Sequence, residues 1–318
     1  MRTPAAPVTP AAASPAEWSV SDPTAEPAGV IRLAADHGLD LAPDSLEFNE
    51  MGLDFRVVLA RTTAGADWVL RIPRRAEVMV RAAVEARVLR LVAPRLDAAV
   101  PDWRIHTGDL IAYPLLPGEP GLEMVDGEPV WRVDVSAPGY AESLGELLAQ
   151  LHGTDPIEAS TTGAPVRTPA YFRQAWRQDI ERVSREFTVA GHLLDRWEAW
   201  LSDESYWPDH AVLTHGEIYP GHTLIRDGRI SGVLDWTTAT VGDPARDFMF
   251  HQATASPEAF RLTVEHYVAG GGQVWPRLAE HCAEMFSANA VAYGLYVLDS
   301  GDESHREAAA AQLNPPAE

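Results

Sequence analysis

The chain of 318 residues contains no lysine, so arginine alone supplies its 25 basic side chains against 46 acidic ones. The formal net charge is −21 at pH 7. Because nucleic acids are bound through clustered basic side chains, this balance argues against DNA or RNA as a partner. A cationic small molecule would instead be attracted to such a chain.

Cysteine and long apolar runs are also scarce. Cys282 is the only cysteine, which excludes an intramolecular disulfide and a metal site built from several thiolates. No stretch reaches the apolar length of a membrane span, and the prolines of the Ala/Pro/Thr-rich N-terminus interrupt any targeting helix. We therefore expect a disordered tail over residues 1–19 and a cytoplasmic protein without a membrane partner.

The pattern of apolar residues differs between the two parts of the chain. Helix signals at 27–38 and 76–92 flank strand signals at 55–60 and 68–72, and an apolar strand follows at 110–118. Later helical stripes lie at 141–152, 172–187, 194–201, 257–269 and 274–300. This pattern predicts an α+β fold with a small sheet-bearing N-lobe and a larger, mainly helical C-lobe.

The most informative residues are His215-Gly216-Glu217, which follow a short apolar strand. His222 comes five residues after the glutamate, and strands at 223–226 and 229–234 flank an Asp-Gly turn that predicts a tight hairpin ending at Asp235. The hairpin would return Asp235 to the loop. Glu217 would then lie near an acceptor hydroxyl, while His222 and Asp235 hold a divalent cation against nucleotide phosphates, as phosphoryl transfer requires.

This order of motifs resembles the aminoglycoside phosphotransferase family, whose fold is like that of protein kinases. Residues 49–55, 68–75, 271–277 and 298–301 are similar to the macrolide 2′-phosphotransferases within it. The resemblance runs from about Ala28 to Leu313.

The resemblance implies a fold and an activity. The expected fold is kinase-like and bilobal, with an N-lobe over residues 20–112, a C-lobe over 113–318 and a hinge near 113–118. The implied reaction moves the γ-phosphoryl group of GTP to the 2′-hydroxyl of a macrolide amino sugar, with Mg²⁺ as the metal. Macrolides carry a dimethylamino sugar, which suits an acidic protein. We expect a monomer.

Several N-lobe residues are then expected at the nucleotide. Arg71 occupies the strand position where kinases have a lysine, and its planar fork can bind phosphate bidentately. Glu85 either pairs with Arg71 or is a solvated helix glutamate. Gly52 lies in the turn over the phosphates or is an ordinary turn glycine, and the backbone of Tyr113 and Leu115 meets the purine edge in the hinge.

Two positions depart from the general pattern of the family. Glu217 stands where the pattern has Asp, and the extra methylene moves the carboxylate by roughly 1 Å, a shift that can cost on the order of a hundredfold in rate. We interpret it as a working base. His222 stands where the pattern has Asn, as in the macrolide enzymes. His215 stands before Gly216 at the end of the strand and is expected to organise the loop. By the resemblance, Asp247 of the following D-P-x-x-D segment supports the loop through hydrogen bonds.

The acceptor side is expected on the last long helical stripe. A macrolactone ring needs a wide apolar surface with few polar groups. Met285, Phe286, Tyr293 and Tyr296 would supply that surface, with Asn289 as a polar anchor.

Three other interpretations remain open. The acceptor could be an aminoglycoside, choline or another small hydroxyl compound, although the aromatic stripe favours a macrolide over a polycation. Glu217 could mark a catalytically weak binding protein. His215, Glu217 and His251 could instead form a two-histidine, one-carboxylate iron site, although such sites belong mainly to strand-rich barrels.

Overall fold

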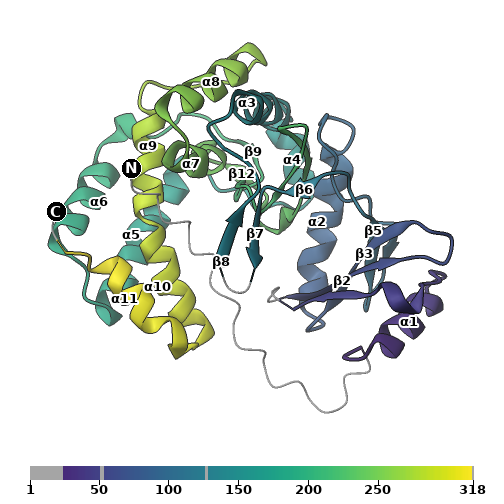
Figure 1. The fold of residues 1–318 in the computed structure, drawn as a ribbon. Helices are drawn as coiled ribbons and strands as arrows, with labels where there is room; N and C mark the ends of the chain where they lie inside the picture. The colour runs from purple at the N-terminus through teal and green to yellow at the C-terminus, as the bar shows by residue number, and fades with distance from the viewer. Residues whose placement is uncertain (1–23, 51–53, 126–127, 317–318) are drawn as a thin grey trace.

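The structure, a computed structural model, describes residues 24–50, 54–125 and 128–316. The tail expected over 1–19 and the turn glycine Gly52 lie outside these residues. Figure 1 shows two lobes, with the sheet-bearing N-lobe on the right and the helices of the C-lobe on the left. Within the described ranges, no helix combines the length and the apolar character needed to cross a membrane.

The N-lobe is built on a five-stranded antiparallel sheet in the order β1-β2-β3-β5-β4. Its strands are β1 (Glu47–Asn49), β2 (Phe55–Arg61), β3 (Asp67–Pro73), β4 (Ile105–His106) and β5 (Ile111–Pro114). Alternate residues of β2 face opposite sides of the sheet. Val58 and Ala60 pack against helix α1 (Pro27–Asp36), whereas Val57 and Leu59 pack against α2 (Val78–Val92). The sheet is therefore covered on both faces.

The C-lobe is mainly helical and holds the largest apolar core. Its helices are α3 (Pro138–His152), α4 (Pro156–Thr161), α5 (Pro169–Glu186), α6 (Gly191–Ser202), α7 (Ala245–Thr254), α8 (Pro257–Ala269), α9 (Leu278–Ser287), α10 (Asn289–Ser300) and α11 (Arg306–Leu313). Short 3₁₀ turns lie at η1 (Pro43–Ser45), η2 (Glu204–Tyr206), η3 (Trp236–Thr238) and η4 (Glu303–His305). Helices α3, α4, α5 and α8 begin with proline, whose missing N–H costs no helical hydrogen bond in the first turn.

One three-stranded and two two-stranded sheets lie among the helices and lead into the loops that carry the candidate site residues. They are β6 (Glu119–Pro120) with β10 (Thr223–Arg226) and β11 (Arg229–Val233), β7 (Leu122–Val125) with β8 (Glu128–Trp131), and β9 (Val212–Thr214) with β12 (Thr240–Gly242). The chain leaves the N-lobe sheet after β5 and enters the C-lobe at β6. Leu116 from this crossing and Leu224 of β10 share one apolar cluster with Val78 of α2, which packs the lobes together.

The expected element types are confirmed where the sequence carried a clear signal, but some boundaries were wrong. The strand expected over 110–118 spans only Ile111–Pro114, and residues 115–118 are irregular. The helix expected from Val274 begins at Leu278, because the Trp-Pro segment before it forms a turn. Helices α4 and α7 and the strands β7, β8 and β12 were not predicted, since short segments carry little periodicity.

Candidate active site

The loop over residues 215–222, which we call the candidate catalytic loop, and the β10–β11 hairpin bring the predicted residues together. Strand β9 leads into His215-Gly216-Glu217, and the hairpin turns at Asp227 and Gly228, both with positive φ, as a two-residue hairpin turn requires. The N–H of Leu234 donates to the carbonyl of His222 (2.9 Å), which ties the end of the hairpin to the loop. Nε2 of His222 consequently lies 3.8 Å from Oδ2 of Asp235.

Asp235 stands in a left-handed backbone conformation (φ 56°, ψ 76°), which aspartate tolerates better than most residues. Its Oδ1 accepts from the N–H (3.3 Å) and the hydroxyl (2.5 Å) of Thr237, which leaves Oδ2 toward His222. Burial works against the charged carboxylate, but His222, Thr237 and Arg71 outweigh it and hold the pKa of Asp235 below its usual value. The carboxylate of Asp235 is therefore ionised at neutral pH and could bind a cation.

Glu217 is a solvent-exposed residue of the loop, but its carboxylate is partly desolvated. Loss of water around the carboxylate raises its pKa, Asp235 adds repulsion, and His222 and Arg246 oppose the shift. Within the described part of the chain, no side chain or N–H donates a hydrogen bond to this carboxylate. The group is free to accept a proton from a ligand.

The loop is held from below by Asp247 of α7. Its carboxylate accepts from the N–H groups of His215 (2.9 Å) and Gly216 (2.6 Å), and from Nε2 of His152 (3.1 Å). Tyr267 meets the other ring nitrogen of His152 at 2.9 Å. The structure contains hydrogen bonds from Asp247 to the loop. His152 and Tyr267 were missed by the sequence analysis, since they come from helices remote in sequence.

His215 is fully buried, and its Nε2 donates to the carbonyl of Leu234 (2.9 Å). Burial lowers the pKa of His215 to about 4, against the opposing charge of Asp247. The ring is therefore neutral at pH 7 and links the loop to the end of the hairpin, which is the organising position expected for it.

Arg246 was also missed by the sequence analysis. Gly216 has φ +92°, and a Cβ there would lie 2.6 Å from the carbonyl of Thr238 and 2.9 Å from both terminal nitrogens of Arg246. The guanidinium lies 5.2 Å from the ring of Phe172. Its charge acts on Glu217, so the loop lies against a half-buried cation. Only glycine admits this approach.

On the nucleotide side, the ion pair left open by the sequence is present. Nη1 of Arg71 lies 2.8 Å from Oε1 of Glu85, and both side chains are buried. The guanidinium also lies 4.2 Å from the ring of Phe55. Asp235 is among the charges that raise the pKa of Arg71 against the cost of burial. The Arg71–Glu85 pair therefore lies close enough to Asp235, at the end of the β10–β11 hairpin, for their charges to interact.

The two expected hinge residues lie where the chain leaves the N-lobe sheet. Tyr113 is buried in the cluster between the sheet and α2, and burial raises its pKa to about 12. Leu115 is exposed, but its N–H donates to the carbonyl of Asp67 (2.9 Å). Because the N–H of Leu115 is already bonded, its backbone carbonyl is the group that could accept a hydrogen bond from a nucleotide base.

The residues expected at the acceptor divide into two groups. Met285 and Tyr293 are buried, and the hydroxyl of Tyr293 meets His305 at 2.8 Å, with Tyr296 packed on the same imidazole. Phe286 and Asn289 are half-buried.

An aromatic path leads from Phe286 toward the loop. The ring of Phe250 lies 6.4 Å from Phe286, 6.4 Å from Trp131 of β8 and 5.4 Å from Tyr219 of the loop. Trp131, Tyr219 and Phe250 were not predicted, because nothing local in the sequence joins them. Phe250 contacts both Phe286 and Tyr219 and so links Phe286 to the loop. Tyr293 and Tyr296 contact each other and His305 instead.

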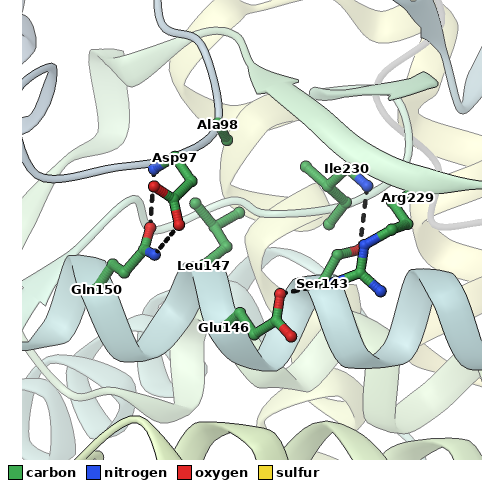
Figure 2. Close-up of a pocket in the computed structure, with 8 residues that line it drawn as sticks. All are labelled: Asp97, Ala98, Ser143, Glu146, Leu147, Gln150, Arg229 and Ile230. Carbon is green, nitrogen blue, oxygen red and sulfur yellow. Dashed lines mark hydrogen bonds and ion pairs between the residues drawn. The ribbon is translucent and has the colours of Figure 1, made fainter.

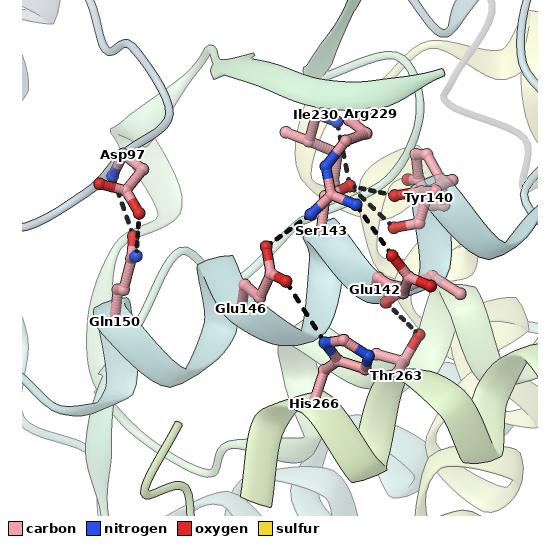
Figure 3. A network of polar contacts seen from close by, with 12 residues as sticks. Asp97, Tyr140, Glu142, Ser143, Glu146, Gln150, Arg229, Ile230, Thr263 and His266 are labelled. Atoms are coloured by element: carbon pink, nitrogen blue, oxygen red, sulfur yellow. Dashed lines mark hydrogen bonds and ion pairs between the residues drawn. The ribbon is translucent and has the colours of Figure 1, made fainter. Parts of the chain in front are cut away.

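The hairpin is supported from behind by α3 (Figure 3). Arg229 pairs with Glu142 (2.9 Å) and Glu146 (2.6 Å), and the N–H of Ile230 donates to the hydroxyl of Ser143 (3.0 Å). A groove of about 140 Å³ lies here. Figure 2 shows the residues that line it, which are Ser143, Glu146, Arg229 and Ile230 together with Asp97, Ala98, Leu147 and Gln150. Because its polar groups already pair with one another, we interpret the groove as structural support.

The donor atoms fit a divalent cation whose coordination is completed by other groups. No three His, Cys, Asp or Glu side chains gather into a metal site among the described residues. The iron arrangement is therefore not found there, and His251 lies instead against the hydroxyl of Thr263 (2.9 Å). His222 and Asp235 offer one nitrogen and one oxygen, and nucleotide phosphates and water would supply the remainder.

This arrangement has close relatives among known proteins. A family model described as the phosphotransferase enzyme family matches residues 45–281. The chain is also 39% identical over 281 residues to the uncharacterised protein YcbJ of Bacillus subtilis (strain 168), a match that covers 87% of this chain and 92% of that protein.

Two solved structures are similar over nearly the whole chain. The apoenzyme of macrolide 2′-phosphotransferase MphH from Brachybacterium faecium is 58% identical, with a TM-score of 0.87 over 91% of this chain and 99% of that one. A macrolide 2′-phosphotransferase type I is 44% identical, with a TM-score of 0.85 over 92% of this chain and 98% of that one. The kinase-like α+β fold expected from the sequence is confirmed.

Proposed function

This chain belongs to the phosphotransferase enzyme family, and we propose that it moves the γ-phosphoryl group of GTP to the 2′-hydroxyl of a macrolide amino sugar. The convergence of Glu217, His222 and Asp235 next to the Arg71–Glu85 pair carries this proposal. The similarity to two macrolide 2′-phosphotransferases supports the acceptor.

In this mechanism Glu217 accepts the hydrogen bond of the acceptor hydroxyl and aims it at the phosphorus. The raised pKa makes its carboxylate a better proton acceptor as the new P–O bond forms. His222 and Asp235 would hold a divalent cation, proposed to be Mg²⁺, which neutralises phosphate charge when bound. His215 and Asp247 hold the loop so that the carboxylate keeps its aim.

The N-lobe would bind the donor. Arg71 offers its guanidinium to the phosphates, and Glu85 fixes its direction. The carbonyl of Leu115 and the backbone of Tyr113 would meet the guanine edge, with Gly52 in the turn over the phosphates. We further propose that the enzyme acts as a cytoplasmic monomer.

The C-lobe would bind the acceptor through an apolar surface near the loop. Phe286 and its neighbour Phe250 lead to Tyr219, beside Glu217, so a macrolactone resting on them would place its sugar at the base. Met285, Asn289, Tyr293 and Tyr296 would shape the remainder of this wall.

The test is a direct assay of the reaction. Purified protein is incubated with erythromycin, Mg²⁺ and either GTP or ATP, and the products are analysed by mass spectrometry. We expect a single added phosphoryl group with GTP. The product should disappear in Asp235→Ala, because the phosphates lose a charged bridge to the protein.

A panel of acceptors tests the other family substrates. Kanamycin and choline are incubated in parallel with erythromycin. Phosphate on kanamycin or choline with none on erythromycin would overturn the macrolide assignment and leave the phosphotransferase in place. Turnover that survives Glu217→Ala unchanged would remove the glutamate from the mechanism.

A further inference from the structure

A cavity of about 340 Å³ lies between α2 and the segment over residues 98–106, which leads from the C-lobe back to the N-lobe sheet. This segment starts beside β11, where the N–H and the carbonyl of Ala99 bond to Ser231 and Val233 (2.9 Å each), and it ends in β4. The apolar part of the lining comes from both sides and consists of Ala86, Leu89, Ala93, Pro101 and Trp103. A volume of this size is at the lower end of those that hold small molecules.

Trp103 joins this cavity to the Arg71–Glu85 pair. The centre of its ring lies 5.5 Å from the guanidinium carbon of Arg71, whose Nη1 lies 2.8 Å from Oε1 of Glu85. The ring also packs against both the C-lobe core and the apolar cluster between the lobes. Its indole N–H is buried and meets no acceptor in the described part of the chain, which is an unfavourable state for a donor. Packing alone therefore holds the indole against Arg71, and an occupant of the cavity would add to that packing.

The exposed part of the lining carries one positive charge without a counter-charge. Nε of Arg90 donates to the carbonyl of Ala86 (3.1 Å), and its guanidinium forms no ion pair with a carboxylate of the described residues. Asp102, the acidic residue of the lining, pairs instead with Arg104 (2.6 Å). Burial, and then the charge of Arg90, lower the pKa of His106, so this imidazole is neutral at pH 7. The cavity therefore offers a single guanidinium to an anion, although the whole chain is strongly acidic.

We propose that this cavity binds a small aromatic monoanion, and that the occupant strengthens the binding of nucleotide phosphates by Arg71. The apolar walls and the indole of Trp103 suit a flat ring system, and Arg90 suits one carboxylate or a similar group. The binding site stands on the cavity alone. The effect on Arg71 rests on the proposed function, which places this guanidinium at the phosphates.

The coupling follows from the position of Trp103 between the cavity and Arg71. An occupant would hold the indole on the guanidinium, and a stacked guanidinium keeps its orientation. Arg71 would then lose less freedom when it binds a phosphate, so the nucleotide should bind more tightly. Because coupling between two sites is reciprocal, the nucleotide should strengthen the binding of the occupant by the same factor.

Nuclear magnetic resonance of the indole N–H groups tests the site. The full chain is made with ¹⁵N-tryptophan, and the resonance of Trp103 is identified by its absence in Trp103→Phe. The probe is 2-naphthoate, and naphthalene-2-carboxamide is its uncharged match. We expect the Trp103 resonance to shift with 2-naphthoate, at a Kd about tenfold below that of the carboxamide. An unmoved resonance, or equal affinities for the two compounds, would overturn the inference.

Substitutions in the lining locate the probe. Arg90→Gln should weaken 2-naphthoate about tenfold and leave the carboxamide unchanged. Arg32→Gln, at an exposed arginine of α1, is the matched control and should change neither. Ala93→Trp, at the exposed end of α2, should fill the cavity and abolish the binding of both compounds. Unchanged binding in a folded Ala93→Trp protein would place the probe elsewhere and refute the proposal. Should that variant not fold, equal Kd values in Arg90→Gln and the unmutated chain refute it instead.

The effect on Arg71 is measured with GDP and needs no macrolide. Saturating 2-naphthoate should lower the Kd of GDP about fivefold, and GDP should lower the Kd of 2-naphthoate equally. The same GDP affinity with and without 2-naphthoate would overturn the link to Arg71.

The cavity site and the proposed function fail separately. A chain that binds 2-naphthoate but neither GDP nor ADP loses the proposed function, and the link with it, and keeps the site. A chain that phosphorylates erythromycin but does not bind 2-naphthoate keeps its function and loses the inference.

Discussion

Asp243 and Asp247 occupy neighbouring turns at the start of α7, and each is paired with a buried histidine. Asp243 accepts from the N–H of Ala245 (2.9 Å) and from Nε2 of His281 (2.8 Å). Nδ1 of the same histidine accepts from the indole of Trp200 (2.9 Å), so the pair is neutral histidine against carboxylate. All of these partners belong to the C-lobe helices or to the turn itself.

Asp247 uses the same chemistry for a different purpose. Besides His152, it accepts from the two N–H groups that open the catalytic loop, those of His215 and Gly216. The comparison teaches that a buried Asp–His pair can anchor a helix or aim a loop. The two carboxylates differ in the backbone N–H groups that they accept from: Asp243 binds its own helix start, whereas Asp247 binds the loop. Substitution of Asp243 should therefore affect mainly stability, and substitution of Asp247 should also affect activity.

The largest contrast is expected between Asp247→Asn and Asp243→Asn. In Asp247→Asn an NH₂ group replaces one acceptor and opposes a loop N–H, so kcat for erythromycin phosphorylation should fall about a hundredfold. Asp243→Asn should lower the unfolding midpoint about as much as Asp247→Asn does, while its kcat stays within about threefold of the unmutated protein. Steady-state kinetics and thermal unfolding of both variants check this. A hundredfold loss of kcat in Asp243→Asn would break the comparison.

Gly216→Ala should come next, because its Cβ would lie 2.6 Å from the carbonyl of Thr238 and its φ is +92°. We expect kcat to fall at least tenfold and stability to drop by about 1–3 kcal/mol. Gly228→Ala is a matched control, with φ +74° and no atom within 4 Å of the new Cβ. It should cost about 1 kcal/mol through strain alone, with kcat retained. Equal losses of kcat would mean that the loop does not need this close packing.

The histidines that pair with the two aspartates, His152 with Asp247 and His281 with Asp243, give a second test of the difference between the sites. His152→Phe and His281→Phe each leave a buried carboxylate short of a donor, so each should destabilise the fold by about 2–3 kcal/mol in denaturant unfolding. Only His152→Phe should also reduce kcat, since its partner Asp247 holds the loop. A normal kcat in a folded His152→Phe protein would show that the backbone bonds alone position Asp247.

The smallest effect is expected at Arg246, whose charge opposes the raised pKa of Glu217. In the proposed mechanism turnover requires the ionised carboxylate of Glu217, so activity should fall as the pH drops through the pKa of that group. Arg246→Met should raise the pKa of Glu217 further and move the acid limb of the kcat profile to higher pH, by up to about one unit. Arg246→Lys keeps the charge and should leave the limb near its original position. A shift to lower pH would contradict the electrostatic assignment.

Local sequence predicted the hairpin and the approach of Asp235 to His222, whereas the catalytic roles of these residues follow from the family resemblance and are proposals. Asp-Gly between two short strands predicts a tight turn, and the hairpin returns Asp235 to within 3.8 Å of His222. The sequence left two interpretations of Glu85 open, a pair with Arg71 or a solvated helix glutamate. The structure shows the pair, with both side chains buried. The limits of the 274–300 helices and the β7–β8 hairpin were missed for lack of periodic signal.

The sequence by itself therefore determined the order of the motifs, the hairpin and the residue types that meet there, because these depend on contacts between near neighbours. Only the tertiary structure decided that His152, Tyr267 and Arg246 lie under the loop, and that Phe250 joins Phe286 to Tyr219. Contacts between segments distant in sequence depend on how helices pack, and the periodicity of one helix does not specify which partner its buried face will meet.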